Sequence, residues 1–103
     1  MKNLVLTQTI EGTTKLFVPD LVKYKQPEFA PVFYNPRMKA DRDVSVALLP
    51  HLLKRKARVL DLLCGLGARS VRYARECGFS VTANDVQPGA VALARKNALL
   101  NKV

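Results

Sequence analysis

Two glycines and an aspartate have the spacing that α/β proteins use to hold a nucleoside. Gly65 and Gly67 form a Gly-x-Gly loop, and Asp85 follows Gly67 by 18 residues. Glycines in such a loop permit a tight turn and let a ligand approach the backbone. A following helix offers free N–H groups, and the acid can accept hydrogen bonds from both hydroxyls of a ribose. The pattern predicts an adenosine ligand; the alternative is a turn that needs glycine and an aspartate that caps a helix.

Two further residues bear on which adenosine ligand is expected. Ser70 occupies the position of the third glycine in the dinucleotide pattern, so that pattern is incomplete. Asp61 lies four residues before Gly65, where a carboxylate suits a cationic amino acid better than a pyrophosphate. S-adenosylmethionine carries an ammonium and a sulfonium, so Asp61 favours a methyl donor. Asp61 could instead order the loop by accepting N–H bonds.

The surrounding segments predict the elements that position these residues. The apolar run 57–63 is typical of a buried parallel strand, and 69–77 predicts a helix that ends at Gly78. Residues 79–83 predict a second strand, and Pro88 suits the first turn of a last helix. The order is a βαβ unit, the first half of a Rossmann-like sheet, which brings the glycine loop and Asp85 to one edge.

The N-terminal part predicts a hairpin and a loop. Residues 4–10 and 13–18 are rich in β-forming residues and flank Glu11-Gly12. Residues 19–36 contain four prolines and predict a loop, with aromatic side chains that could pin it to the body: Phe29, Phe33 and Tyr34. We therefore divide the chain into residues 1–36 and a partial Rossmann-like domain of residues 37–103.

A helix is expected between this loop and the first parallel strand. Asp41 or Asp43 can cap it, and apolar residues at helical spacing continue toward Lys54. Pro50 is expected to kink this helix or to start a second one.

Composition limits the class of protein. The chain has 103 residues, of which 49% are hydrophobic and 24% charged, which fits one small domain and excludes a multidomain protein. We expect no membrane span, because no apolar run approaches about 18 residues. The first residues are too polar for a signal peptide, so we expect a cytoplasmic protein. Cys64 and Cys77 are expected to be free thiols, and no metal site is predicted. His51 is expected to have a structural role and no role in catalysis or binding.

Positive charge is concentrated in the middle of the chain. The net charge is +9, and residues 37–75 contain ten Lys or Arg against three Asp. Such a surface favours a phosphate-rich partner, because neutralised phosphates release counterions. A solvated basic surface is the alternative.

Several segments spread over nearly the whole chain together form a recognisable pattern. The most specific is Phe33-Tyr-Asn-Pro-Arg-Met38 followed by Asp41-Arg-Asp43. The pattern continues through Leu60-Asp61, Gly67, Arg69, Arg72-Tyr-Ala74, Asn84-Asp85, Pro88, Ala90-Val91 and Asn97. With these segments the sequence resembles the archaeal and eukaryotic tRNA guanine-N2 dimethyltransferases, which methylate the exocyclic amine of guanine 26.

The resemblance implies S-adenosyl-L-methionine as cofactor and tRNA as partner. Arg37, Arg69 and Asp85 match family residues that contact the cofactor. An arginine can bind a carboxylate through two hydrogen bonds, which fits Arg37, and Arg69 would lie near the methionine carboxylate. The alternatives are an ion pair of Arg37 with Asp41 or Asp43, and a solvated or RNA-facing Arg69.

The sequence also departs from that family. Leu63 stands where the general methyltransferase pattern has its first glycine, and the family's acceptor-binding Asp-Pro-Phe motif is absent. We therefore expect an N-terminal fragment that binds cofactor, carries no catalytic residue and is inactive by itself. A non-catalytic basic RNA-binding module and a dinucleotide-binding fragment of an oxidoreductase are the competing hypotheses. The sequence leaves the oligomeric state open.

Overall fold

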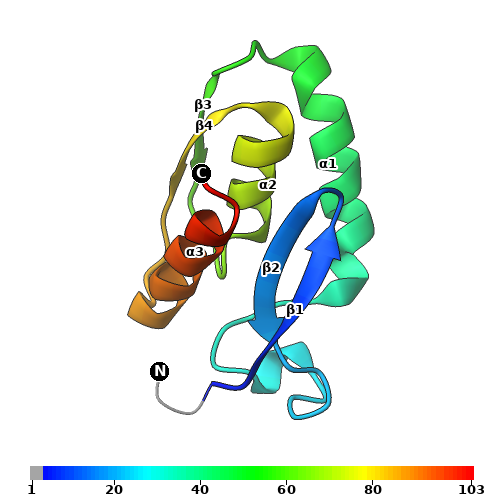
Figure 1. Ribbon diagram of the computed structural model, residues 1–103, viewed down its shortest axis with the longest axis vertical. Coiled ribbons are helices and arrows are strands. Elements are labelled where there is room, and N and C mark those ends of the chain that lie inside the picture. The colour runs from blue at the N-terminus through cyan, green and yellow to red at the C-terminus, as the bar shows by residue number, and fades with distance from the viewer. Residues whose placement is uncertain (1–3) are drawn as a thin grey trace.

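The computed structural model describes residues 4–103 and contains two small sheets and three α-helices (Figure 1). In chain order the elements are β1 (Leu6–Glu11), β2 (Thr14–Pro19), η1 (Pro27–Phe29), η2 (Pro36–Met38), α1 (Lys39–Leu52), β3 (Arg58–Asp61), α2 (Ala68–Cys77), β4 (Ser80–Ala83) and α3 (Pro88–Leu100). None of the described helices is long and apolar enough to cross a membrane.

The predicted βαβ unit is present. β3 and β4 pair in parallel with Asp61 opposite Ala83, and Gly78 ends α2 in the left-handed conformation at φ +73. The prediction that the first strand is buried is wrong, since Leu60 is 58% exposed. Asp61 faces α2 through a hydrogen bond from Ser70, whereas Leu60 lies on the opposite face of the strand. No helix among residues 4–103 covers that opposite face.

The predicted hairpin is also present, and it shares a core with the βαβ unit. β1 and β2 are antiparallel, and Gly12 takes φ +58 at the first position of a two-residue turn, as such hairpins favour. One cluster of buried residues joins the hairpin, the loop, α2 and α3: Leu16, Val18, Val32, Tyr34, Leu66, Ala68, Ala90 and Leu93. The division of the chain at residue 36 stays a prediction.

The loop between the hairpin and α1 is held by only one of the three aromatic side chains expected to do so. Tyr34 is buried as predicted, and Val32 is buried beside it. Phe29 and Phe33 are 66% and 53% exposed, so the expectation that they anchor the loop is wrong.

α1 differs from its prediction at both ends. It begins at Lys39 with Met38 as its N-cap, so neither Asp41 nor Asp43 caps it. Pro50 lies inside the last turn of α1, which continues to Leu52, so the expectation that it starts a second helix is wrong. Since proline has no N–H, it leaves one carbonyl without a helical donor. That carbonyl belongs to Val46, and the thiol of Cys77 on α2 lies 3.5 Å from it. A side chain of the neighbouring helix thus compensates for the missing N–H.

Candidate functional site

The structure brings the predicted acid and the glycine loop together. One carboxylate oxygen of Asp85 accepts the N–H of Gly65 at 2.9 Å, and the other accepts the N–H of Gln87 at 3.0 Å. The bonds from Gln87 and Gly65 lower the pKa of Asp85, so the carboxylate is ionised at neutral pH. Each oxygen keeps a lone pair for a further donor, such as a ribose hydroxyl. Asp85 therefore orders the loop and the start of α3 while it remains available to a ligand.

The two glycines of the loop are needed for different reasons. Gly67 is the N-cap of α2 at φ +86, and a Cβ there would lie 3.0 Å from the Cβ of Ala94. At Gly65, with φ +55, a Cβ would lie 3.6 Å from the carbonyl oxygen of Phe33, which is an ordinary contact distance. Gly67 serves the packing of α2 against α3, and Gly65 leaves space for a ligand beside the backbone.

A cavity of about 160 Å³ opens beside Gly65 and carries polar groups of both signs. Arg69 and Asp61 line it, together with Asn35, Arg42 and apolar neighbours. The guanidinium of Arg69 donates to the hydroxyl of Ser45 at 3.0 Å, which holds it at this cavity.

Asp61 has a role that the sequence did not indicate. Its carboxylate accepts the hydroxyl of Ser70 at 2.6 Å, so it fixes the first turns of α2 rather than accepting N–H groups of the loop. Ser70, at the third glycine position, is buried and supplies this bond. Asp61 also lines the cavity and keeps acceptor capacity beyond the bond from Ser70.

Arg37 lies apart from the other predicted residues. It lines a second, polar hollow together with Lys25 and Gln26, and Asn35 borders both hollows. The backbone N–H of Arg37 donates to Asn35, while its exposed side chain pairs with neither Asp41 nor Asp43. The alternative interpretation, an ion pair, is therefore wrong, and the role of Arg37 toward a ligand stays a prediction.

A buried ion cluster is the main feature that sequence reasoning missed. Glu11 is fully buried and accepts two hydrogen bonds from Arg42, at 2.8 and 2.7 Å, and one from Tyr34. Arg72, also buried, pairs with Asp43 at 2.6 Å and with Glu76 at 2.8 Å. Arg42 and Arg72 belong to the basic segment predicted to face phosphate, and here they join the hairpin, α1 and α2.

The neighbours of Glu11 in this cluster lower its pKa. Burial alone would raise it, but the hydrogen bonds from Arg42 and Tyr34 and the charges of Arg42 and Arg72 outweigh burial and lower it. Glu11 is therefore ionised and fully paired inside the protein.

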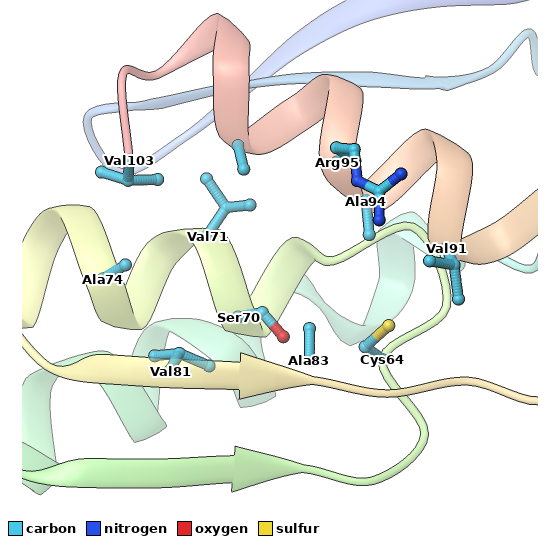
Figure 2. Close-up of a pocket in the computed structure, with 11 residues that line it drawn as sticks. Cys64, Ser70, Val71, Ala74, Val81, Ala83, Val91, Ala94, Arg95 and Val103 are labelled. Atoms are coloured by element: carbon cyan, nitrogen blue, oxygen red, sulfur yellow. The ribbon is translucent and has the colours of Figure 1, made fainter.

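A larger cavity, of about 280 Å³, lies between α2, β4 and α3 (Figure 2). Its lining is mostly apolar and includes Val71, Val81 and Val91, and the Cys64 thiol borders it (Figure 2). Burial raises the pKa of Cys64, which keeps the thiol neutral. Arg69, Asp61 and Gly65 line the smaller polar cavity and do not line this one, so the smaller cavity is the better candidate site.

The parallel strands, the glycine loop and the strand-end acid define a protein of the Rossmann-like class. Residues 12–103 match the family model of N2,N2-dimethylguanosine tRNA methyltransferases, and the chain belongs to this family. The resemblance noted from its motifs is thereby confirmed.

The chain is also similar to individual proteins of this kind, in sequence and in structure. The tRNA (guanine(26)-N(2))-dimethyltransferases of Metallosphaera sedula and Pyrobaculum aerophilum are 39% and 41% identical over 95% and 100% of this chain. The structure of Trm1 from Pyrococcus horikoshii in complex with S-adenosyl-L-methionine superposes over 93% of this chain and 24% of its own, with a TM-score of 0.79 and 37% identity. The chain spans 27% and 28% of the length of the two curated relatives. The Rossmann-like fold class is confirmed.

Proposed function

We propose that this chain is the cofactor-binding part of an S-adenosyl-L-methionine-dependent tRNA guanine-N2 methyltransferase, acting on guanine 26. The observation that supports it most directly is the contact of Asp85 with Gly65 at the common edge of β3 and β4. The similarity to Trm1, a structure that holds S-adenosyl-L-methionine, supports the same cofactor.

The residues present fit the nucleoside half of this cofactor. The free acceptor sites of Asp85 suit the ribose hydroxyls, and Gly65 leaves room for the sugar to approach the backbone. Val86, the next residue, is 89% exposed and offers an apolar surface to a purine ring. This exposed valine is a candidate that the sequence did not reveal.

The small polar cavity suits the amino-acid half. Arg69 can bind the carboxylate and Asp61 the ammonium group, because both side chains line the cavity beside Gly65. Arg37 would join Arg69 by turning its exposed side chain past Asn35. When bound, the cofactor supplies an electrophilic methyl group on its sulfonium.

The chain's own share of the reaction is to bind and orient the methyl donor. The exocyclic amine of guanine is a poor nucleophile and must meet the methyl group in an oriented, dry site. No residue of this chain has a proposed role in holding the guanine, so we propose that the chain by itself binds cofactor without transferring the methyl group. We place the protein in the cytoplasm.

Calorimetric titration with S-adenosyl-L-methionine tests this proposal. We expect saturable one-site binding, competition by S-adenosylhomocysteine, and no competition by NAD. A chain that is folded by circular dichroism but binds neither sulfur nucleoside would contradict the proposal. Preferential binding of NAD would favour the oxidoreductase hypothesis instead.

A further inference from the structure

The connection between α1 and β3 carries a concentration of unpaired positive charge. Lys54, Arg55, Lys56 and Arg58, together the basic turn, are all exposed. None of them forms a salt bridge or a side-chain hydrogen bond within residues 4–103. The sequence contains no acidic residue between Asp43 and Asp61.

Other cations of the same basic segment are already neutralised. Arg42 and Arg72 are buried against Glu11, and Lys39 pairs with Asp43 at 2.8 Å. The charge of three of the ten cations in residues 37–75 is thus balanced by nearby carboxylates, and four of the other seven lie together at the basic turn.

The backbone of the basic turn is fixed. The N–H of Lys56 donates to the carbonyl of Gly78 at 3.0 Å, and the N–H of Ala57 donates to that of Lys54 at 3.0 Å. Lys56 has φ +65, and a Cβ on Gly78 would lie 3.4 Å from Cγ of Arg55. Charges on a fixed turn lose only side-chain freedom when they bind a partner, which lowers the entropic cost of binding.

Stabilisation of helix ends does not account for this many cations. The C-termini of α1 and α2 lie at this end of the molecule, and each carries roughly half a negative charge. Together they balance about one of the four cations. The rest of the charge remains for an external anion.

The basic turn lies at the amino end of β3, and the glycine loop lies at its carboxyl end (Figure 1). Within the strand, Arg58 of the basic turn and Asp61 of the cavity lining are three residues apart, which is roughly 10 Å at 3.3 Å per residue. The basic turn and the candidate cofactor cavity thus lie at opposite ends of β3.

We propose that the basic turn binds the phosphodiester backbone of RNA, at a distance from the nucleotide that is methylated. This inference rests on the proposed function, because it takes tRNA as the partner. Phosphate contacts position a nucleic acid without reading its sequence. The basic turn therefore contributes affinity and orientation, not base specificity.

The experiment measures binding of a fluorescent, unmodified tRNA transcript to the 103-residue chain by anisotropy at several salt concentrations. The test variant combines Lys54→Gln, Arg55→Gln and Lys56→Gln. The matched control combines Arg95→Gln, Lys96→Gln and Lys102→Gln, which removes the same charge from exposed positions on and after α3. Titration with S-adenosyl-L-methionine and thermal unfolding accompany each variant.

We expect the test variant to bind tRNA at least about tenfold more weakly at 0.1 M salt, with a salt slope shallower by roughly 2 to 3. The control variant should stay within about threefold of the unmodified chain, since it lacks these phosphate contacts. Cofactor binding and melting temperature should match the unmodified chain in both variants.

Three outcomes of the tRNA titrations would overturn the inference. These are equal losses in both variants, an unchanged test variant, and absence of tRNA binding by the unmodified chain at low salt. Binding of the unmodified chain to phosphatidylserine vesicles in preference to tRNA would also overturn it, in favour of a membrane surface. Retained cofactor binding in any of these cases would leave the proposed function standing, whereas loss of cofactor binding by the unmodified chain would count against the proposed function itself.

Discussion

At the scale of single residues, Asp85 combines a structural role with a binding role. Its two oxygens hold the N–H groups of Gly65 and Gln87, and both oxygens keep acceptor capacity. A carboxylate already fixed by the backbone loses little freedom when a ribose binds. The same two bonds lower its pKa and so favour the ionised form, which accepts stronger hydrogen bonds than a neutral group.

Replacement of Asp85 by alanine should weaken binding of S-adenosyl-L-methionine about 10- to 100-fold, because hydrogen bonds to a charged group contribute about 1.5–3 kcal/mol. Calorimetry measures the effect. Asp41→Ala is the matched control, since Asp41 is exposed and forms no salt bridge within the described part of the chain. Equal affinity of Asp85→Ala and the unmodified chain would remove the ribose contact from the proposal.

The two glycines of the loop should respond differently to alanine. Gly67→Ala should lower the free energy of unfolding by about 2–4 kcal/mol, because a left-handed backbone and a close contact with Ala94 act together. Gly65→Ala should cost about 1–2 kcal/mol, from the backbone alone. It should nevertheless weaken cofactor binding. Urea denaturation and calorimetry on both variants distinguish these roles, and the reverse order of stabilities would show that the assignment is wrong.

That the glycines and Asp85 lie at one edge of the sheet could be predicted from the sequence, because these residues follow strands that the apolar pattern indicates. The role of Asp61 could not be predicted in the same way. Its hydroxyl partner, Ser70, is nine residues away and meets it only after α2 has packed on the sheet. The signal for this bond that the sequence did offer is the polar residue Ser70 in the third glycine position.

At the scale of elements, α3 holds the hairpin through two asparagines one helical turn apart. Asn97 exchanges hydrogen bonds with the N–H and the carbonyl of Phe17, at 2.7 and 3.2 Å. Asn101 does the same with Lys15, at 3.0 and 2.7 Å. The side-chain amides thus occupy the free edge of β2, as a neighbouring strand would.

Asn97→Asp should destabilise the chain by about 2–4 kcal/mol. The change keeps the shape but turns the amide that donates to Phe17 and Leu66 into an acceptor, which leaves buried carbonyls without donors. Urea denaturation measures the loss, and hydrogen exchange at the N–H of Phe17 should become faster. Asn84→Asp is the control, because Asn84 is exposed. Equal effects of the two changes would refute the edge-pairing role.

The helices and strands could be predicted from local sequence patterns. Which of their faces are buried could not be predicted in this way. The sequence marks β3 as apolar, but which strand face is covered depends on where α2 and α3 pack. Likewise, Pro50 is a poor helix residue locally, and the thiol of Cys77 that compensates for it comes from another helix. Compensation of this kind is a tertiary effect that no local pattern contains.

At the scale of the whole molecule, the ion cluster around Glu11 links the hairpin to both α1 and α2. Removing one member of a buried ion pair leaves an uncompensated charge and costs about 3–5 kcal/mol. The motif Asp41-Arg-Asp43, which carried much of the family resemblance, therefore serves the fold at Arg42 and Asp43. Charge counts could not separate these residues from exposed ones such as Lys54.

This cluster should make the chain sensitive to acid. The folded pKa of Glu11 lies below its ordinary value of about 4.3, so between the two values the unfolded chain binds more protons. The contribution is fully present above about pH 4.3 and is lost as the pH falls through the folded pKa. Melting temperatures between pH 7 and 3 should therefore fall more steeply for the unmodified chain than for Glu11→Gln. That variant lacks the titrating group but should be less stable at pH 7.

Should Glu11→Gln not fold, Tyr34→Phe provides the test, because it removes one hydrogen bond from Glu11 and should weaken the acid dependence. Glu28→Gln, at an exposed position, should keep the slope of the unmodified chain, and the same slope in Tyr34→Phe or Glu11→Gln would exclude Glu11 as its source.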